Sequence, residues 1–588
     1  MERERPLLIF DGNCGFCRIW IEYWRSLTKQ RIDYAPSQEV AHDFPQIPRD
    51  EFARSVQLVG TDGSITSGAR AVFESLGLTW MYALVAWPSE VAYRFVASHR
   101  DLFYGITKWT FGTRIQPTSF ERVQGVFVRA LAAIYAVAFF SLYTQIVGLV
   151  GSHGILPVQP FLQEVASVYG GARFYLLPTL FWINASDAAL RGACLAGVAI
   201  AASLFFRKFQ RACLIALYAL YLSITHAGQV FLGYQWDSLL LEAGFLAIFL
   251  GRSNLTPWLY RLLVFRLYFL SGVVKLASGD PEWRSLSALQ FHFHTQPLPT
   301  FLAWYADKLP AATLRASTLA MFAIELGAPI FIFAPRLWRL AAAWAMISLQ
   351  VLILATGNYT YFNWLTLALL LWLFDDQFLG GKAPVALGGK APVARDGKAP
   401  AARGSKARWA FAAMLLLGAI PIVESLGGPV PNIVASVSSY AAPFQIANPY
   451  GLFAVMTTER KEIRVEGSDD GEHWLAYEFR YKPNHPTDRP RWIAPLQPRL
   501  DWQMWFAALG DARSNPWFTN FAGALLEGSP DVLGLLARNP FPQHPPRYVR
   551  AEAELFTFSS PQERTSTGRW WRAAPAEEYL PAVALRAR

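Results

Sequence analysis

The chain has 588 residues, of which 53% are hydrophobic and 16% charged, and it carries a formal net charge of +10 at pH 7. Long apolar runs gather between residues 121 and 426, which excludes a purely water-soluble protein. The positive charge does not indicate nucleic-acid binding, because much of the basic excess lies in short connections between the apolar runs.

The N-terminal part of the chain carries a redox-type cysteine pair. A short apolar strand is expected at 7–10, and the sequence Asp11-Gly-Asn-Cys14-Gly-Phe-Cys17 then leads into a helical run over 18–27. Cys14 is therefore expected at a helix N-terminus, where unpaired amides and the helix dipole favour the thiolate over the thiol. Asp11 is placed to accept a proton or to orient the pair, although its charge opposes thiolate formation.

This Asp-x-x-Cys-x-x-Cys pattern resembles the small DCC-type thiol-disulfide oxidoreductases over about residues 5–115. The segment Ser67-Gly68-Ala69 follows in the expected order. The resemblance implies a thioredoxin-like α/β domain over 1–120, with Cys14, Cys17 and Asp11 as its catalytic residues. Two other interpretations stay open: a structural zinc half-site, for which no second ligand pair is visible nearby, and chemically inert cysteines.

Nine apolar segments are predicted to cross a membrane as helices, because runs near twenty residues match a hydrocarbon core of about 30 Å. The predicted spans are 126–150, 188–206, 211–226, 230–251, 258–277, 313–334, 337–355, 359–375 and 408–426. The piece 174–183 is too short to cross and contains Pro178, so it is predicted to be interfacial or re-entrant. Cys194 and Cys213 are expected to be small packing residues within spans.

Basic residues predict the orientation of this bundle, which covers 121–379 and 408–426. Fourteen Lys and Arg lie in the connections assigned to the inside and four in those assigned to the outside. This bias predicts a cytosolic N-terminus, with residues 427–588 across the membrane on the periplasmic or lumenal side. In the cytosol, the cysteine pair would serve as a reductant or sensor rather than as an oxidant.

Residues 380–407 hold an eight-residue repeat with four Lys in register. Its Ala, Gly, Pro and Lys residues offer little apolar area to offset the entropy of ordering, so a flexible linker is predicted. A basic tether to anionic lipid is the alternative.

Five ionisable residues fall inside the predicted spans: Asp237, Glu242, Arg266, Lys275 and Glu325. An isolated charge at the bilayer centre costs about 3 kcal/mol, so pairing is expected. Glu242 and Arg266 lie at similar depth in adjacent antiparallel spans and are predicted to pair. Asp237 and Lys275 lie toward the outer side, and Glu325 could join either pair. The alternative to helix-packing ion pairs is a polar cavity with a chemical or client-binding role.

An aromatic outer loop over 278–310 contains Trp283 and the sequence FHFH. Packing at the membrane interface is the expectation for its aromatic side chains. His292 and His294 could share a metal if this segment were extended, but no Cys or carboxylate cluster supports one. We predict neither a metal nor a cofactor.

Residues 427–588 are predicted to form an α+β domain rich in strands. Alternating residues at 461–467 and 473–481 flank a turn, which is typical of a hairpin. Short helices are expected at 501–510, 516–527 and 530–538, and strands at 547–558 and 568–572.

Tryptophan and arginine are dense in this domain, and such residues often anchor protein interfaces. Trp474 and Trp502 are expected in its core. The client-binding candidates are Trp283, Arg499, Trp505, Trp517, Trp570 and Trp571.

Motifs across about residues 121–585 resemble the lipase maturation factor family. They include GSHGILP (151–157), YQWDSLLLEAGFLA (234–247), SGVVKLASGDPEW (271–283), TQPLP (295–299), NYTYFNWL (358–365) and the run from Asn448 to Trp517. Two departures are His294, where Glu is expected before Thr-Gln-Pro, and Leu496, where His is expected. The resemblance implies a multi-span membrane protein whose exported domain helps secreted lipases, or related exported clients, to fold.

Two other functions compete with this interpretation. The segment FRLYFLSGVVKLASGDPEW more faintly resembles the lysine-bearing helix of vitamin-K-dependent gamma-glutamyl carboxylase, which would make Lys275 a base in a membrane-embedded enzyme. The other is a cytosolic thiol reductant anchored to a membrane body.

Overall fold

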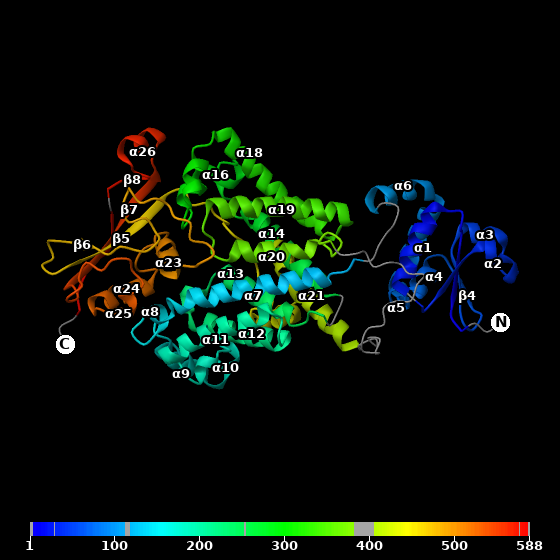
Figure 1. Cartoon of the computed structure of the whole chain (residues 1–588), viewed down its shortest axis with the longest axis horizontal. Coiled ribbons are helices and arrows are strands. Elements are labelled where there is room, and N and C mark those ends of the chain that lie inside the picture. Colours follow the sequence, from blue (N-terminus) through cyan, green and yellow to red (C-terminus); the bar gives the residue numbers. More distant parts are fainter. Residues whose placement is uncertain are drawn as a thin grey trace. The chain divides into compact units, whose positions relative to one another are not determined.

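The computed structural model describes residues 4–28, 30–111, 118–251, 255–380, 405–575 and 577–585, without the side chains of 80, 81, 84 and 405–410. The chain divides into two compact units (Figure 1). The first holds Met1–Arg122, Phe333–Ala341 and Phe374–Ala401, and the second holds Val123–Ile332, Ala342–Leu373 and Ala402–Arg588. The predicted linker at 380–407 lies almost wholly outside the described residues.

The N-terminal domain is built on a four-stranded sheet in the order β2-β1-β3-β4. Strand β1 is parallel to β2 and antiparallel to β3, and β3 is antiparallel to β4. The strands are β1 Leu7–Phe10, β2 Asp33–Pro36, β3 Gln57–Val59 and β4 Ile65–Ser67. The helices are α1 Gly15–Thr28, α2 Ser37–Val40, α3 Arg49–Arg54, α4 Gly68–Ser75, α5 Thr79–Ser98 and α6 Arg100–Phe111. The predicted α/β class of this domain is confirmed.

Both faces of this sheet are covered, because successive residues of a strand point to opposite sides. Leu8 and Phe10 pack in one apolar cluster with residues of α1 and α4. Leu7 and Ile9 pack in another with Phe52 of α3. The loop that leaves β1 therefore emerges at a fixed place and leads directly to the cysteine pair.

The membrane-type bundle has a helix at each of the nine predicted places. These helices are α7 Glu121–Tyr143, α11 Asp187–Phe205, α12 Gln210–Ala227, α13 Gln235–Ala247, α14 Thr256–Ala277, α18 Ala311–Phe322, α19 Arg336–Thr356, α20 Phe362–Leu370 and α21 Ser405–Ser425. Helix α14 packs against α13, α20 and α21 (Figure 1).

Four segments among the described residues are long and apolar enough to cross a membrane, so the predicted count of nine is not confirmed. They are Glu121–Tyr143, Asp187–Phe205, Ala311–Phe333 and Arg336–Thr356. Among the other five helices, α13 has 13 residues and α20 has 9, so both are shorter than a membrane span.

Shorter helices connect the bundle helices. They are α8 Ile146–Val150, α9 Val158–Tyr169, α10 Arg173–Leu176, α15 Pro281–Arg284, α16 Leu289–Thr295 and α17 Phe301–Asp307. No continuous helix covers 174–183, because α10 ends at Leu176 and a separate 3-10 turn begins at Leu180.

The C-terminal domain contains a five-stranded sheet in the order β6-β5-β7-β8, with β9 also pairing with β7. The strands are β5 Arg460–Ser468, β6 Leu475–Ala476, β7 Tyr548–Phe558, β8 Trp571–Ala573 and β9 Glu577–Val583. The helices are α22 Asn432–Ala441, α23 Arg499–Ala507, α24 Pro516–Leu526, α25 Pro530–Leu533 and α26 Pro561–Thr567. The predicted hairpin is confirmed, although its second strand is shorter than expected, and β9 was not predicted.

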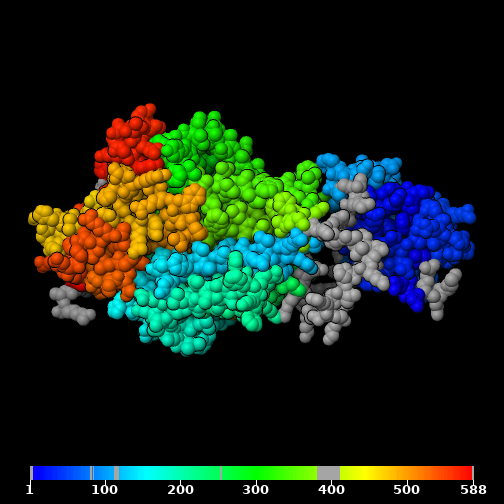
Figure 2. Space-filling view, viewed as in Figure 1, coloured from blue at the N-terminus to red at the C-terminus, as the bar shows by residue number. Residues whose placement is uncertain are grey.

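This domain packs directly on the outer loop of the bundle, and Figure 2 shows its red atoms against the green ones on that face. A buried apolar cluster joins Phe293 and Trp304 of the loop to Phe556, Phe558 and Trp571 of the sheet. Phe293 and Trp304 therefore pack within the protein.

Candidate functional site

The C-terminal domain is fixed to the bundle by a buried ion pair. Arg499, the first residue of α23, contacts Asp237 of α13 at 2.8 Å (Nη2 to Oδ1) and 3.1 Å (Nη1 to Oδ2). The two side chains are 1% and 0% exposed. Nη1 also donates to the carbonyl of Phe231 at 2.6 Å. We call this contact region between bundle and C-terminal domain the seam.

Two tyrosines complete the surroundings of Asp237. The hydroxyls of Tyr221 and Tyr361 donate to its Oδ1 at 2.5 and 2.8 Å, and the two hydroxyls lie 2.6 Å apart. A buried ion pair offsets its desolvation better when further hydrogen bonds hold the charged atoms, and the two tyrosines supply such bonds at Oδ1.

A second buried pair lies in the seam. Glu242 of α13 and Arg266 of α14 form an ion pair, so the predicted pairing is confirmed. The backbone N–H of Asn448 and the hydroxyl of Tyr450 donate to Glu242 Oε2 at 3.1 and 2.8 Å. Arg266 Nη1 donates to the carbonyl of Asn448 at 3.1 Å. The segment that enters the C-terminal domain thus closes over the pair.

The third pair joins Lys275 of α14 to Glu325. The ammonium lies 2.8 and 3.0 Å from the two carboxylate oxygens and also donates to the carbonyl of Ser271 at 3.1 Å. Glu325 lies in a π-helical turn, Ala323–Gly327, where helix α18 widens. Glu325 therefore pairs with Lys275, while Asp237 takes its partner from the C-terminal domain.

Polar groups of the family-like motifs make further contacts across the seam. Asn358 Oδ1 accepts the backbone N–H groups of Ile493 and Ala494 at 2.6 and 3.0 Å, and its Nδ2 donates to the carbonyls of Leu298 and Arg491. Motifs far apart in the chain therefore meet in space.

The guanidinium of Arg460, at the start of β5, lies among three carbonyls of the outer loop. It donates to the carbonyls of His294, Gln296 and Pro297, and its Cζ lies 5.1 Å from the centroid of the Trp571 ring. Sequence reasoning missed Arg460, Asn358 and Asn448. The only signal was that polar residues stand inside otherwise apolar motifs.

The six client-binding candidates lie at or near the seam. Five of them are less than 9% exposed: Trp283, Arg499, Trp517, Trp570 and Trp571. Trp505 is half-buried and donates from Nε1 to the carbonyl of Thr295 at 2.7 Å. These contacts do not test whether a client touches these residues. Trp502 lies in the core as predicted, whereas Trp474 was predicted there and is only half-buried beneath Arg550.

The two histidines of the outer loop contact different partners. His294 Nδ1 lies 2.7 Å from Asp307 Oδ1, and His292 packs against the ring of Phe453. Among the described residues, no group of three or more His, Cys, Asp or Glu could hold a metal ion.

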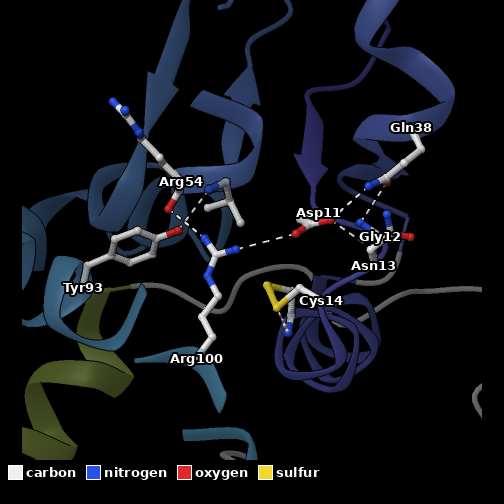
Figure 3. The surroundings of a disulfide bond; sticks show 10 residues. Asp11, Gly12, Asn13, Cys14, Gln38, Arg54, Tyr93 and Arg100 are labelled. Atoms are coloured by element: carbon white, nitrogen blue, oxygen red, sulfur yellow. Dashed lines mark hydrogen bonds and ion pairs between the residues drawn. A yellow bond between two sulfur atoms is a disulfide. The ribbon is translucent and has the colours of Figure 1, made fainter. Parts of the chain in front are cut away.

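In the N-terminal domain, Cys14 and Cys17 form a disulfide at the start of α1 (Figure 3). The backbone N–H of Cys17 donates to Cys14 Sγ at 3.2 Å. A helix N-terminus that points an amide at one sulfur favours a thiolate on that sulfur when the bond opens. In this oxidised state the two sulfurs are bonded to each other and do not form the zinc half-site considered above.

Asp11 is fixed beside the disulfide by three neighbours (Figure 3). Its Oδ1 accepts the N–H of Asn13 at 3.0 Å and Nε2 of Gln38 at 2.9 Å. Its Oδ2 lies 3.7 Å from Nη1 of Arg100, whose Nη2 donates to the carbonyl of Arg54. The carboxylate is thus oriented and partly neutralised, and its catalytic role stays a prediction.

A cavity of about 390 Å³ opens beside this disulfide. Cys17, Asp11 and Arg100 line it together with apolar side chains of α1, α4 and α5. Periodicity alone did not indicate this cavity, because its walls come from helices distant in sequence.

Together, the fold and the seam define a class: a membrane-type helical bundle with a C-terminal α+β domain locked onto its outer loop, preceded by a thiol-disulfide domain. The family model of the lipase maturation factor transmembrane domain matches residues 122–381, and that of the lipase maturation factor C-terminal domain matches 446–581. The chain belongs to the lipase maturation factor family. The model of DCC1-like thiol-disulfide oxidoreductases matches residues 8–106.

Curated relatives cover most of the chain. It is 35% identical to lipase maturation factor 2 of Homo sapiens over 78% of this chain and 82% of the relative. It is 34% identical to lipase maturation factor 1 of Bos taurus over 80% of this chain and 90% of the relative. No solved structure matches.

The two competing functions gain no support from these relatives. The ammonium of Lys275 is 4% exposed and held by Glu325, whereas a general base needs a neutral amine that faces a substrate. The DCC1-like family model matches only residues 8–106. A function as a thiol reductant alone would leave the larger part of the chain without a role.

Proposed function

We propose that this chain is a membrane-bound maturation factor that helps secreted lipases, or related exported proteins, reach their folded form. The observation that carries the proposal is identity of 34–35% with lipase maturation factors across both the bundle and the C-terminal domain. The seam supports it physically, because a domain held by buried ion pairs is presented to a client in one orientation.

Co-expression with a secreted lipase tests this function. The measured quantity is lipase activity divided by the mass of secreted lipase, in cells that lack other members of the family. We expect the full chain to raise this ratio at least several-fold and a chain without residues 427–588 to leave it at background. An equal ratio with and without the full chain would refute the proposal.

The proposed orientation places the N-terminus in the cytosol and residues 427–588 across the membrane, in a bacterial inner membrane or an ER-type membrane. The supporting observation is the excess of Lys and Arg in the connections assigned to the cytosol. This orientation puts the C-terminal domain on the side where an exported client folds.

Client contact through the six candidates is a narrower proposal. A client could touch Trp505 directly, since this side chain is half-buried. For Trp283, Arg499, Trp517, Trp570 and Trp571, direct contact requires the C-terminal domain to open from the outer loop. Otherwise these five act by holding the domain in place.

The N-terminal domain is proposed to perform thiol-disulfide exchange through Cys14 and Cys17. Its βαβ unit followed by a hairpin and a helix is the arrangement expected of a thioredoxin-like domain. Cys14→Ser/Cys17→Ser in the co-expression assay tests coupling. We expect lipase maturation to persist, because the two units are separately compact. A loss equal to that of the 427–588 deletion would show that the two activities are coupled.

A further inference from the structure

We propose that the cavity beside Cys17 binds the apolar part of a thiol substrate, so that this domain exchanges preferentially with thiols that carry an uncharged aromatic or branched aliphatic group. The inference rests on the proposed exchange activity and names its substrate class. The cavity, at about 390 Å³, has a size common for small-molecule sites.

The lining of the cavity selects against charged substrates. Aromatic rings of Phe16, Trp20, Trp24, Phe73 and Tyr93 face it. The Tyr93 hydroxyl oxygen accepts the N–H of Val56 at 3.0 Å.

The charged lining residues are Asp11 and Arg100, and they neutralise each other across 3.7 Å. A charged group that entered the cavity would lose its water and meet walls that are mostly apolar, whereas an apolar group would gain by burial.

The two sulfurs differ in position. Cys17 lines the cavity, whereas Cys14 accepts the N–H of Cys17 at the helix N-terminus. The amide that donates to Cys14 stabilises negative charge on that sulfur, and a stabilised thiolate leaves faster. A substrate whose apolar part fills the cavity is therefore placed to attack Cys17, with Cys14 as the leaving sulfur.

The exchange balances as follows. The substrate thiolate forms a bond to Cys17 Sγ, the Cys14–Cys17 bond breaks, and Cys14 leaves as a thiolate that takes the substrate's proton. A second substrate thiol attacks the substrate sulfur of the mixed disulfide and releases Cys17, which takes the second proton. Two thiols become one disulfide, and the two electrons reduce the cysteine pair to a dithiol.

Reduction rates of the full oxidised chain in lipid nanodiscs test the preference. The probes are 2-phenylethanethiol, 2-mercaptoethanol and glutathione, each rate being divided by that of the same thiol with a small unhindered disulfide. We expect the normalised rate of 2-phenylethanethiol to exceed the other two at least tenfold. Equal normalised rates would overturn the inference while leaving the exchange activity established. Failure of all three thiols would remove the exchange activity and the inference with it.

Two measurements locate the preference in the cavity. Val96→Trp fills it, and we expect the advantage of 2-phenylethanethiol over 2-mercaptoethanol to fall below threefold. Val91→Trp, on the exposed side of the same helix, should keep the full advantage. Free 2-phenylethanol should slow the reaction with 2-phenylethanethiol but not the reaction with 2-mercaptoethanol. This competition measurement does not depend on the folding of a variant. An advantage that survives both filling and competition would place the selectivity elsewhere.

Alkylation during the reaction identifies the attacked sulfur. We expect mass mapping to find the phenylethylthio group on Cys17 and the alkyl label on Cys14. The reverse distribution would overturn the assignment of Cys17 as the attacked sulfur.

Discussion

At the scale of single residues, buried charges account for the seam. Sequence depth paired Glu242 with Arg266, and the structure agrees. Depth in the membrane could not predict the partner of Asp237. That partner, Arg499, is 262 residues away and belongs to the C-terminal domain rather than to a span. Removal of one partner leaves the other as an uncompensated buried charge. Substitutions at these pairs are therefore expected to lower stability the most.

Arg499→Met is expected to destabilise the seam by about 3–5 kcal/mol, because Asp237 would remain as a buried charge without its partner. Thermal unfolding in detergent micelles measures the effect. Adding Asp237→Asn should recover part of the loss by removing the orphaned charge. Arg513→Met, at an exposed position of the same domain, should change stability by no more than about 0.5 kcal/mol. Equal unfolding temperatures for the two arginine variants would contradict the role of the pair.

His292 should make stability depend on pH. Burial, followed by the charges of Lys275 and His294, lowers the pKa of His292 from 6.5 to about 4. Because the unfolded chain then binds the proton first, this contribution is fully present above about pH 6.5 and is lost as pH falls toward 4.

Unfolding temperatures at pH 7 and pH 5 check this dependence. We expect His292→Gln to show a smaller fall between the two values than His473→Gln, whose histidine is exposed. Identical falls in the two variants would mean that His292 does not titrate in this range.

At the scale of elements, short helices of the outer loop are ordered by contacts with the C-terminal domain. Helix α15 has four residues and could not persist alone. Asp280 caps it through the N–H groups of Glu282 and Trp283, and its other oxygen accepts the N–H of Met456 at 3.0 Å. One carboxylate thus joins the loop to the segment that precedes β5.

Asp280→Ala is expected to destabilise this junction by about 2–4 kcal/mol, from a lost cap and an unsatisfied buried N–H at Met456. Hydrogen exchange at the amides of Trp283 and Met456 should become faster. Asp511→Ala removes a similar but exposed cap to Ser514 and serves as the matched control. Unchanged exchange at Met456 would show that the contact contributes little.

At the scale of the whole molecule, the chain combines two separately compact units with one predicted orientation. The four segments that satisfy length and hydropathy do not fix the side of either terminus. The distribution of Lys and Arg does make a definite prediction, since cytosolic loops carry the basic excess.

Reporter fusions after residue 115 and after residue 588 test this orientation. We expect a reporter active only in the cytosol to work at the first position and one active only across the membrane to work at the second. Swapping the two reporters should abolish both signals. Activity of one reporter at both positions would contradict the orientation and remove the C-terminal domain from the compartment of an exported client.

The sequence predicted much of the secondary structure and less of the site. Apolar runs, the hairpin turn near Asp470 and the strand before Cys14 are local patterns, so they were visible without the fold. Trp474 was misplaced because the predicted strand over 473–481 is reduced to Leu475–Ala476, so Trp474 precedes the strand and lies beneath Arg550. The count of nine spans is not confirmed by length and hydropathy, although the buried charges of α13 and α14 are paired within the chain.

By itself, the sequence determined the order of domains, the redox motif and the likeness to lipase maturation factors, since each is written in residues close together along the chain. Tertiary structure alone decided that Arg499 reaches Asp237, that Glu325 holds Lys275, and that a cavity lies beside Cys17. The physical reason is that a buried charge or an apolar wall is defined by neighbours in space, and folding brings those neighbours from hundreds of residues away.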